Sequence, residues 1–520
     1  MDTTSSTMTN ETDMSEGHPR RWVVLWIMCL SLVLVVVSVS SLNVAIPAIQ
    51  RSLEATGSEL QWIIDSYALA FAGLLLPAGA LGDRYGRRGA LLFGLAIFAV
   101  ASIGGLFSSS PEQLIGWRAL TGAGAAFIMP ATLSIVTTVF PRSERGRAIA
   151  IWAGFAGAGG AVGLIMSGLL LERFWWGSIL LINVPIVIAL AIGTLTLVPS
   201  SRDESEASLD PTGAVLSIVG LAALVFAIIE GPEAGWTDPL TLTAVVVAVV
   251  AVGLFLVWEL RITNPMLDPR FFKDRQFSLG SLTITLAFFG IFGMFFVVTQ
   301  YFQFVQGLSP LQAGVRILPY ALVLLVAAPR SARVVERLGG RVVVVIGSVA
   351  AAVGFGLLAL SDPSTPYLQT AVALVVVAAG VGFLMPPSTS AIVTSLPADK
   401  AGVGSAVNDL TREVGGLIGI AVVGSLVALG YRSSVSEVTA DLPDDVVHAA
   451  EDSIGGLQTV AADLPAEAAG QLLDAGADAF THGMRWGMGA AAGTMLVSAV
   501  LVAILLPRGT TSTRSQGEGS

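Results

Sequence analysis

The sequence predicts an all-α polytopic membrane protein, and three observations carry that prediction. Only 12% of the 520 residues are charged and 54% are hydrophobic, whereas roughly a quarter of the residues in soluble domains are charged. Stretches such as 22–42 and 342–360 hold no charged residue and are long enough to cross a bilayer. Fourteen apolar segments can be counted, which start near residues 22, 60, 89, 112, 147, 179, 212, 240, 278, 312, 342, 368, 405 and 483.

The first segment is expected to remain in the mature protein. The polar stretch 1–21 precedes a full-length span rather than the short apolar core and cleavage site of a signal peptide. Because fourteen spans put both termini on one side, the basic residues decide which side it is. With the termini inside, twenty of the 27 basic residues fall in inner segments. We therefore expect a multi-pass protein of the cell (inner) membrane with both termini cytoplasmic.

The next feature is an internal repeat, which organises the spans. The loop 79–88 has a counterpart at 332–341, 253 positions later, and the loop 140–146 has one at 396–402, 256 positions later. Two agreeing offsets indicate a duplication, an architecture known among transporters. The expected parts are a cytoplasmic tail (1–21), a six-helix bundle (22–199), two inserted transmembrane helices with linkers (200–277), a second six-helix bundle (278–506) and a cytoplasmic tail (507–520).

One long outer loop, 430–482, is expected within the second bundle. It carries ten acids between residues 437 and 478 against the single Arg432. The loop either forms a solvated hydrophilic cap or creates a field that gathers cations at an outer vestibule. The net charge of −10 without a basic patch argues against a nucleic-acid partner, and the single cysteine cannot form an intrachain disulfide.

Several motifs along the chain resemble those of one family. They are the loop 79–88, Arg118-Ala-Leu-Thr-Gly122, the glycine-rich fifth span, and the segments 42–47, 61–67, 181–185 and 408–416. In this order they resemble the 14-spanner drug:proton antiporters of the major facilitator superfamily, over nearly the whole chain. The resemblance implies a major facilitator fold and a secondary active transporter that exports small apolar or cationic drugs and antibiotics in exchange for protons by alternating access.

The alternative is an exporter or facilitator of an endogenous metabolite with weak or no proton coupling. An ATP-driven pump would need a phosphate-binding loop, and a membrane enzyme would show clustered histidines or metal-ligand spacing. The chain contains neither, so we expect no catalytic residue, cofactor or metal. The expected partners are a small-molecule substrate, protons and the lipid bilayer, and we expect the protein to act as a monomer.

The loop after the second span is the first candidate site. It contains Gly79, Asp83, Arg84, Gly86, Arg87 and Arg88, and Gly86 is free to adopt the positive φ of a tight turn. These arginines either set membrane topology alone or, as the resemblance implies, form a conformational latch. In the latch, Asp83 lies against the N-terminus of the thirteenth span near Gly402, where free amides favour an anion. The repeat assigns the same role to Glu336, with Arg337 beside it, near Gly146.

Glycines in the fifth span predict close helix packing, at Gly157, Gly163 and Gly168 among others. The family's signature here expects a Gly-Pro and a Gly-Gly pair, and this chain has Leu164 and Ser167 in place of the proline and the first glycine.

Ionisable residues inside spans are costly and count as functional candidates. Asp65 and Arg118 lie about one and a half turns inside the outer starts of their helices, unless they snorkel to the surface. Arg316 lies close to the position that the repeat assigns opposite Asp65. We therefore expect Asp65 and Arg316 to pair across the cavity in one state.

The thirteenth span carries the preferred coupling cluster. Asp409 and Glu413 are four residues apart and share a helix face with Arg412. Desolvation raises and a nearby guanidinium lowers the proton affinity of a carboxylate, so entry of substrate or water can switch it. The alternative is a self-neutralised Asp–Arg bridge. Ser38 stands where family members commonly carry an acid, which leaves the strength of proton coupling open. Aromatic residues of the spans either line a cavity for flat apolar or cationic compounds or, as we expect for most of them, face lipid or the membrane interface. They are Trp62, Tyr67, Trp117, Trp152, Phe288, Phe289, Phe292, Phe295 and Phe296.

Overall fold

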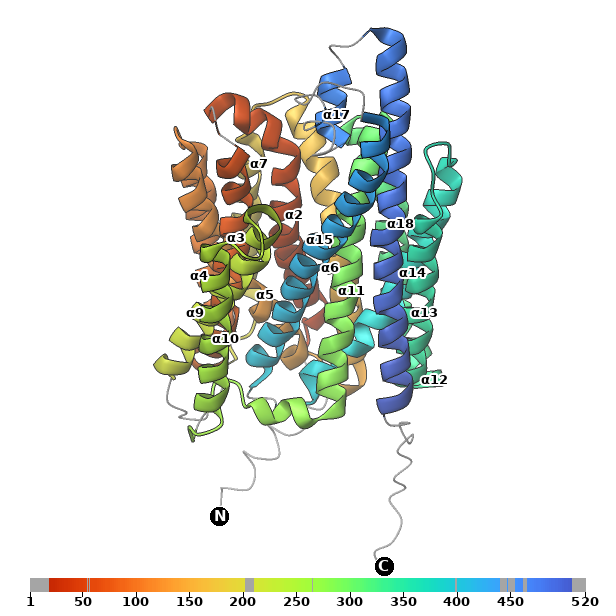
Figure 1. Cartoon of the computed structure of the whole chain (residues 1–520). Helices are drawn as coiled ribbons and strands as arrows, with labels where there is room; N and C mark the ends of the chain where they lie inside the picture. The colour runs from red at the N-terminus through yellow and green to blue at the C-terminus, as the bar shows by residue number, and fades with distance from the viewer. Residues whose placement is uncertain are drawn as a thin grey trace, which may run out of the picture.

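The predicted fold class is confirmed by the computed structural model of the chain (Figure 1). The structure describes residues 18–53, 55, 57–201, 210–263, 265–397, 400–439, 447, 454–461 and 465–506. Within these ranges every regular element is a helix, and fourteen spans are long and apolar enough to cross a membrane.

The first half contains six spans, the last of them divided into two helices. Their bounds are α2 Arg21–Leu53, α3 Gly57–Tyr85, α4 Arg87–Leu106, α5 Pro111–Val139, α6 Arg142–Leu171, α7 Ser178–Leu181 and α8 Asn183–Leu197. Two further spans follow, α9 Pro211–Ala234 and α10 Pro239–Glu259.

The second half begins after the short 3-10 helix η1 Pro269–Lys273. It contains α11 Arg275–Gln300, the π-helical turn η2 Tyr301–Val305, α12 Pro310–Leu338, α13 Gly340–Ala359, α14 Tyr367–Thr394, α15 Ala401–Thr439, α17 Ile454–Ala461 and α18 Ala466–Leu505.

The helix starts follow from local chemistry. Proline is the first residue of α5, α9, α10 and α12, where its missing N–H costs nothing. Asp238 accepts hydrogen bonds from the first turn of α10, and Ser309 and Gln312 form a capping box at the start of α12. Polar caps therefore set where several loops give way to helix.

The duplication is visible in the packing of glycines. A side chain added to Gly94 on α4 would lie 2.7 Å from the carbonyl oxygen of Gly124 on α5. Gly347 and Gly380, 253 and 256 positions later, show the same distance between α13 and α14. Gly86 ends the turn after α3 and has a φ of 112°. Gly339, 253 positions later, ends the turn after α12 and has a φ of 81°. The two halves therefore share backbone geometry as well as loop motifs.

Two pairs of helices make most of the contact between the halves, and α5 with α15 and α6 with α14 add to it. α6 packs along α12, and α3 packs against α15. The inserted helix α9 contacts both α3 and α15, with the rings of Trp62 and Phe226 centred 5.7 Å apart. The inserted pair is thus seated beside one of the two seams between the halves.

The outer stretch 430–482 is more helical than expected. α15 continues to Thr439 and α18 begins at Ala466, so helices replace much of the expected loop. Figure 1 shows the first turns of α18 extending beyond the other helices at the end that carries α17. Most of the ten acids of this stretch lie outside the described residues, and the choice between a cap and a cation-gathering field stays a prediction.

Candidate functional site

Arg118 is buried inside the first half. Its side chain extends from α5 and the residue is 1% exposed. Nε donates a hydrogen bond to the carbonyl oxygen of Ile63 at 3.2 Å, Nη1 donates to Oγ of Ser38 at 3.4 Å, and the guanidinium lies 4.7 Å from the ring centre of Tyr67. No ion pair to a carboxylate is found for it in the part of the chain that the structure describes. Neutral groups, among them Ser38, therefore hold this cation.

Asp409 and Arg412 form a buried pair on α15. They are 1% and 4% exposed, and Nη1 of Arg412 lies 3.4 Å from Oδ1 of Asp409. The guanidinium lies 4.9 Å from the ring of Trp152 on α6 and 5.0 Å from the ring of Phe288 on α11. Among the described residues, Oδ2 of Asp409 and both Nε and Nη2 of Arg412 have no hydrogen-bond partner. The guanidinium of Arg412, in the second half, thus packs on the ring of Trp152 in the first half. Both Asp409 and Arg412 keep polar atoms that can form further hydrogen bonds.

Glu413 extends this cluster towards the first half. It is partly buried, and its charge is close enough to Asp409 and Tyr67 to interact with both. Tyr67 is buried, and its hydroxyl has no hydrogen-bond partner among the described residues. Tyr67 therefore stands between Arg118 of its own half and Glu413 of the other. Its sequence position indicated a cavity aromatic but gave no sign of this bridging place.

Glycines bring α15 against α11. A side chain on Gly415 would contact the carbonyl oxygen of Thr285, and one on Gly419 the backbone of Phe289. This close approach holds the charged turn of α15 beside the ring of Phe288. A side chain on Gly416 would contact the ring of Phe292, so Gly415 and Gly416 of the 408–416 motif both have a packing reason.

The fifth span packs in the corresponding way. A side chain on Gly163 would contact Ser40 and Val37 of α2, and one on Gly168 would lie 3.1 Å from Leu311 of α12. The surroundings of Gly157 lie outside the described residues. Ser167, where the family expects glycine, donates a hydrogen bond to the carbonyl oxygen of Gly163 at 2.7 Å. Gly163 thus joins α6 to a helix of its own half, and Gly168 joins it to the other half.

Arg316 is engaged within the second half. Its Nη1 donates to Oε1 of Gln306 at 2.6 Å, and its guanidinium lies 4.9 Å from the ring of Tyr367. The hydroxyl of Tyr367 donates to the carbonyl oxygen of Arg316 at 3.1 Å. Asp65 is partly buried on α3 and has interactions of its own. The structure does not bring the two together, so their pairing stays a prediction for another arrangement of the halves.

Asp83 joins the end of α3 to the start of α15. It is 4% exposed, and its Oδ2 accepts hydrogen bonds from the N–H groups of Gly402 at 2.7 Å and Val403 at 3.1 Å. Its Oδ1 accepts from Nε of Arg87 at 2.8 Å. A side chain on Gly79 would lie 2.7 Å from the carbonyl oxygen of Gly402. An anion thus sits on the free amides of a helix N-terminus, as the latch requires.

The neighbouring arginines attach the same loop to the first half. Nη1 of Arg88 donates a hydrogen bond to the carbonyl oxygen of Val198 at 3.3 Å. The backbone N–H of Arg87 donates to the carbonyl oxygen of Ser201 at 3.0 Å. The guanidinium of Arg84 lies 5.6 Å from the ring of Tyr85. The arginines therefore attach this loop to the first half, while Asp83 contacts the second half.

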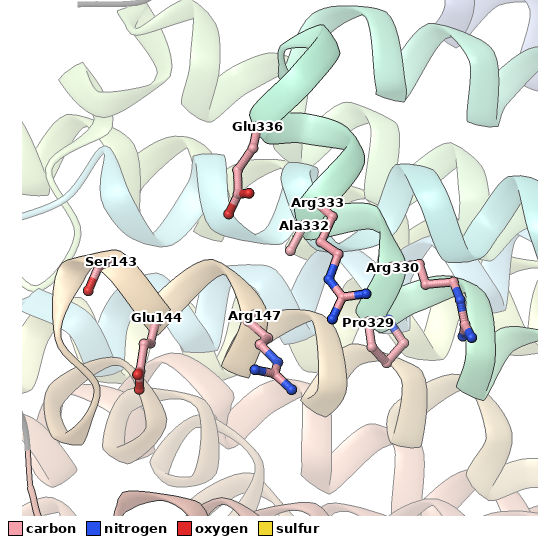
Figure 2. Close-up of a pocket in the computed structure, with 8 residues that line it drawn as sticks. All are labelled: Ser143, Glu144, Arg147, Pro329, Arg330, Ala332, Arg333 and Glu336. Carbon is pink, nitrogen blue, oxygen red and sulfur yellow. The ribbon is translucent and has the colours of Figure 1, made fainter.

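Glu336 does not make the corresponding contact. It is exposed, as is Arg337, and it has no hydrogen bond or ion pair with any described residue. A cavity of about 420 Å³ separates the end of α12 from the start of α6 (Figure 2). Its charged and hydroxyl side chains are Ser143, Glu144, Arg147, Arg330, Arg333 and Glu336. The expected contact near Gly146 is absent, because Glu336 faces this cavity instead of the first turn of α6.

Fourteen spans, glycine contacts that recur at the offset of the predicted repeat, and incompletely neutralised charges between the helices are typical of a polytopic membrane transporter. The chain belongs to the Major Facilitator Superfamily, whose model matches residues 28–420. The resemblance noted in the motifs is confirmed.

Similar proteins include the multidrug efflux pump LfrA of Mycolicibacterium smegmatis, 38% identical over 94% of this chain and 97% of the relative. The methyl viologen resistance protein SmvA of Salmonella typhimurium is 34% identical over 92% and 97%. The methylenomycin A resistance protein of Streptomyces coelicolor is 37% identical over 75% and 82%. The solved structure of the human organic anion transporter MFSD10 is similar in fold, with a TM-score of 0.62, 15% identity, and 93% and 100% of the chains covered.

Proposed function

We propose that this protein exports small apolar or cationic drugs and antibiotics in exchange for protons, by alternating access of its two halves in the cell membrane. Efflux and resistance proteins among its relatives, similar over most of their length, support the substrate class. The arginine distribution supports cytoplasmic termini.

The observation that carries the proposal is the cluster between the halves. Arg412 lies on the Trp152 ring beside Asp409, and Glu413 lies near Tyr67. A flat cationic compound is attracted to aromatic faces in the same way as a guanidinium. Such a compound can compete with Arg412 for Trp152 and leave Asp409 to bind the incoming charge.

Proton exchange follows from the same competition. A buried carboxylate is costly when it is charged and unpaired, so it holds a proton, an arginine or a cationic substrate. In the proposed cycle Asp409 and Glu413 are protonated in the state in which Arg412 has left Asp409; they release these protons as the substrate arrives and regain protons after it leaves. The contacts with Trp152 and Tyr67 cross the seam between the halves, so rocking of the halves changes the surroundings of both carboxylates.

Transport into everted membrane vesicles tests this proposal, with a panel of cationic dyes and antibiotics and with or without a pH gradient. We expect uptake to depend on the gradient and to be lost in the Asp409→Asn/Glu413→Gln variant. Glu467→Gln, which neutralises an exposed acid at the start of α18, serves as the control. Undiminished gradient-driven uptake by a variant that also carries Asp65→Asn would remove the carboxylates from the mechanism.

One observation favours the alternative of weak or absent coupling. Ser38, rather than an acid, meets Arg118, so one proton carrier of the family is missing. A metabolite facilitator of this kind would show the same uptake with and without the pH gradient. The vesicle experiment therefore separates the two functions.

A further inference from the structure

The cavity between α6 and α12 has an excess of positive charge. Arg147 extends into it from α6, and Arg333 and Glu336 extend from α12 towards α6 (Figure 2). Arg330 adds a third guanidinium to the lining, with its side chain directed away from Arg147 (Figure 2). The carboxylate of Glu144 is already paired with Arg21, whose Nε and Nη2 donate to it at 2.6 and 3.2 Å.

Glu336 is therefore the one lining carboxylate without a partner, set against three guanidiniums. None of these guanidiniums forms an ion pair with a described residue. Arg147 lies 5.0 Å from the ring of Trp22, and Arg330 donates from Nη1 to the carbonyl oxygen of Val326 at 2.9 Å. These contacts neutralise no charge, and Glu144, which also interacts with Arg147, is shared with Arg21. Arg147 and Arg333 therefore bring like charges from both halves to one space, which favours an anion there.

The cavity borders the lipid-facing side of α12. Leu322 and Val326 are 60% and 52% exposed, and they precede Arg330 at intervals of four residues on the same helix face. Apolar side chains that are this exposed on a spanning helix face acyl chains, and the arginine one turn further along lies at the depth of the head groups. Any anion held there has an apolar track leading away from it into the membrane.

We propose that this cavity binds the phosphate group of an anionic phospholipid from the cytoplasmic leaflet. Arg147 on α6 and Arg333 on α12 bind the phosphate from opposite sides, because the guanidinium fork matches phosphate geometry. Basic pockets between spanning helices on this side of a membrane suit such head groups. An acyl chain follows Leu322 and Val326. The bound phosphate connects the two halves where Glu336 makes no contact, and the site does not depend on what the protein transports.

Native mass spectrometry of the full-length protein tests the site, with phosphatidylglycerol or phosphatidylcholine added to the detergent solution. We expect retention of phosphatidylglycerol in preference to phosphatidylcholine. In the Arg147→Gln/Arg333→Gln variant the affinity for phosphatidylglycerol should fall about tenfold or more, since each guanidinium–phosphate hydrogen bond involves charged partners. Arg337→Gln, which removes an exposed arginine of α12 outside the cavity lining, should bind as the wild type does.

Two results would overturn the proposal. Equal phosphatidylglycerol retention by the double variant and the wild type would show that the arginines do not hold the lipid. Displacement of phosphatidylglycerol by millimolar inorganic phosphate would identify a soluble anion as the ligand. The single variant Arg333→Gln changes an exposed side chain without an ion pair and keeps the test decisive if the double variant folds poorly; its affinity for phosphatidylglycerol should also fall.

Discussion

Replacing Asp83 with asparagine should weaken the joint between α3 and α15. Two of the three hydrogen bonds to this carboxylate cross the seam, from the N–H groups of Gly402 and Val403, and the third comes from Arg87 in the same half. A hydrogen bond to a charged group contributes about 1.5–3 kcal/mol and a neutral one about 0.5–1.5 kcal/mol. The two bonds across the seam therefore lose about 2 kcal/mol together, and the population with this joint open should rise roughly thirty-fold.

Distance measurements by electron paramagnetic resonance report this population. Spin labels at Gly89→Cys on α4 and Thr394→Cys on α14 would lie on opposite halves, and both positions are exposed. Replacing the buried Cys29 with alanine avoids a third label. Asp83→Asn should add a longer distance at the cytoplasmic end. It should also slow gradient-driven dye uptake in everted vesicles without reducing the amount of protein in the membrane.

Glu336→Gln is the matched control. Glu336 holds the equivalent place in the repeat but has no partner among the described residues, so its neutralisation should not increase the longer distance. The latch would be disproved by a well-inserted Asp83→Asn protein with the wild-type distance distribution and normal transport.

Three further changes test the packing and the charge cluster. Gly415→Val should lower the free energy of unfolding by about 1–3 kcal/mol through overpacking, which a lower melting temperature in detergent would show. In the control Gly493→Val the new side chain points into open space, so the melting temperature should not change. Equal melting temperatures for the two variants would contradict the close approach of α15 to α11. A double-mutant cycle of Arg412→Gln and Trp152→Leu should show a coupling of about 0.5–2 kcal/mol in thermal unfolding, and simple additivity would mean that the ring does not hold the cation. Ser38→Asp should pair with the neighbouring guanidinium and make dye uptake depend more steeply on pH than in Ser38→Asn; identical pH profiles would separate this position from coupling.

The spans and the repeat were predictable because they depend on local properties of the chain. Segment length and hydropathy identify a span wherever it packs, and Gly86 and Gly339 take positive φ because each ends a tight turn. The helical extension of α18 before residue 483 was missed, since polar residues such as Glu467 and Asp474 hide a helix from a hydropathy count. In this segment the helix propensity of the residues, rather than a buried apolar face, was the signal that could have predicted the helix.

The contacts across the seam were only partly predictable. The motif resemblance located Asp83 opposite Gly402, because one carboxylate and one helix N-terminus suffice for that contact. It did not foresee that Glu336 would be left without a partner, since that depends on how the two halves are set relative to each other. The contact of Arg316 with Gln306 was not predictable for a similar reason. Gln306 lies after η2, where no periodic pattern signals its approach to Arg316.

The two halves repeat their scaffold but not their chemistry. The glycine contact of Gly94 with Gly124 recurs at Gly347 with Gly380. By contrast, the positions 256 residues before Asp409, Arg412 and Glu413 hold Ala153, Ala156 and Gly157.

Trp152, on the helix that carries these small residues, instead receives the guanidinium of Arg412 from the other half. A symmetric pair of charged clusters would instead place two guanidiniums in one low-dielectric space, at a large electrostatic cost. The loss of symmetry in the side chains is therefore what allows one buried cation to cross the seam between two symmetric backbones.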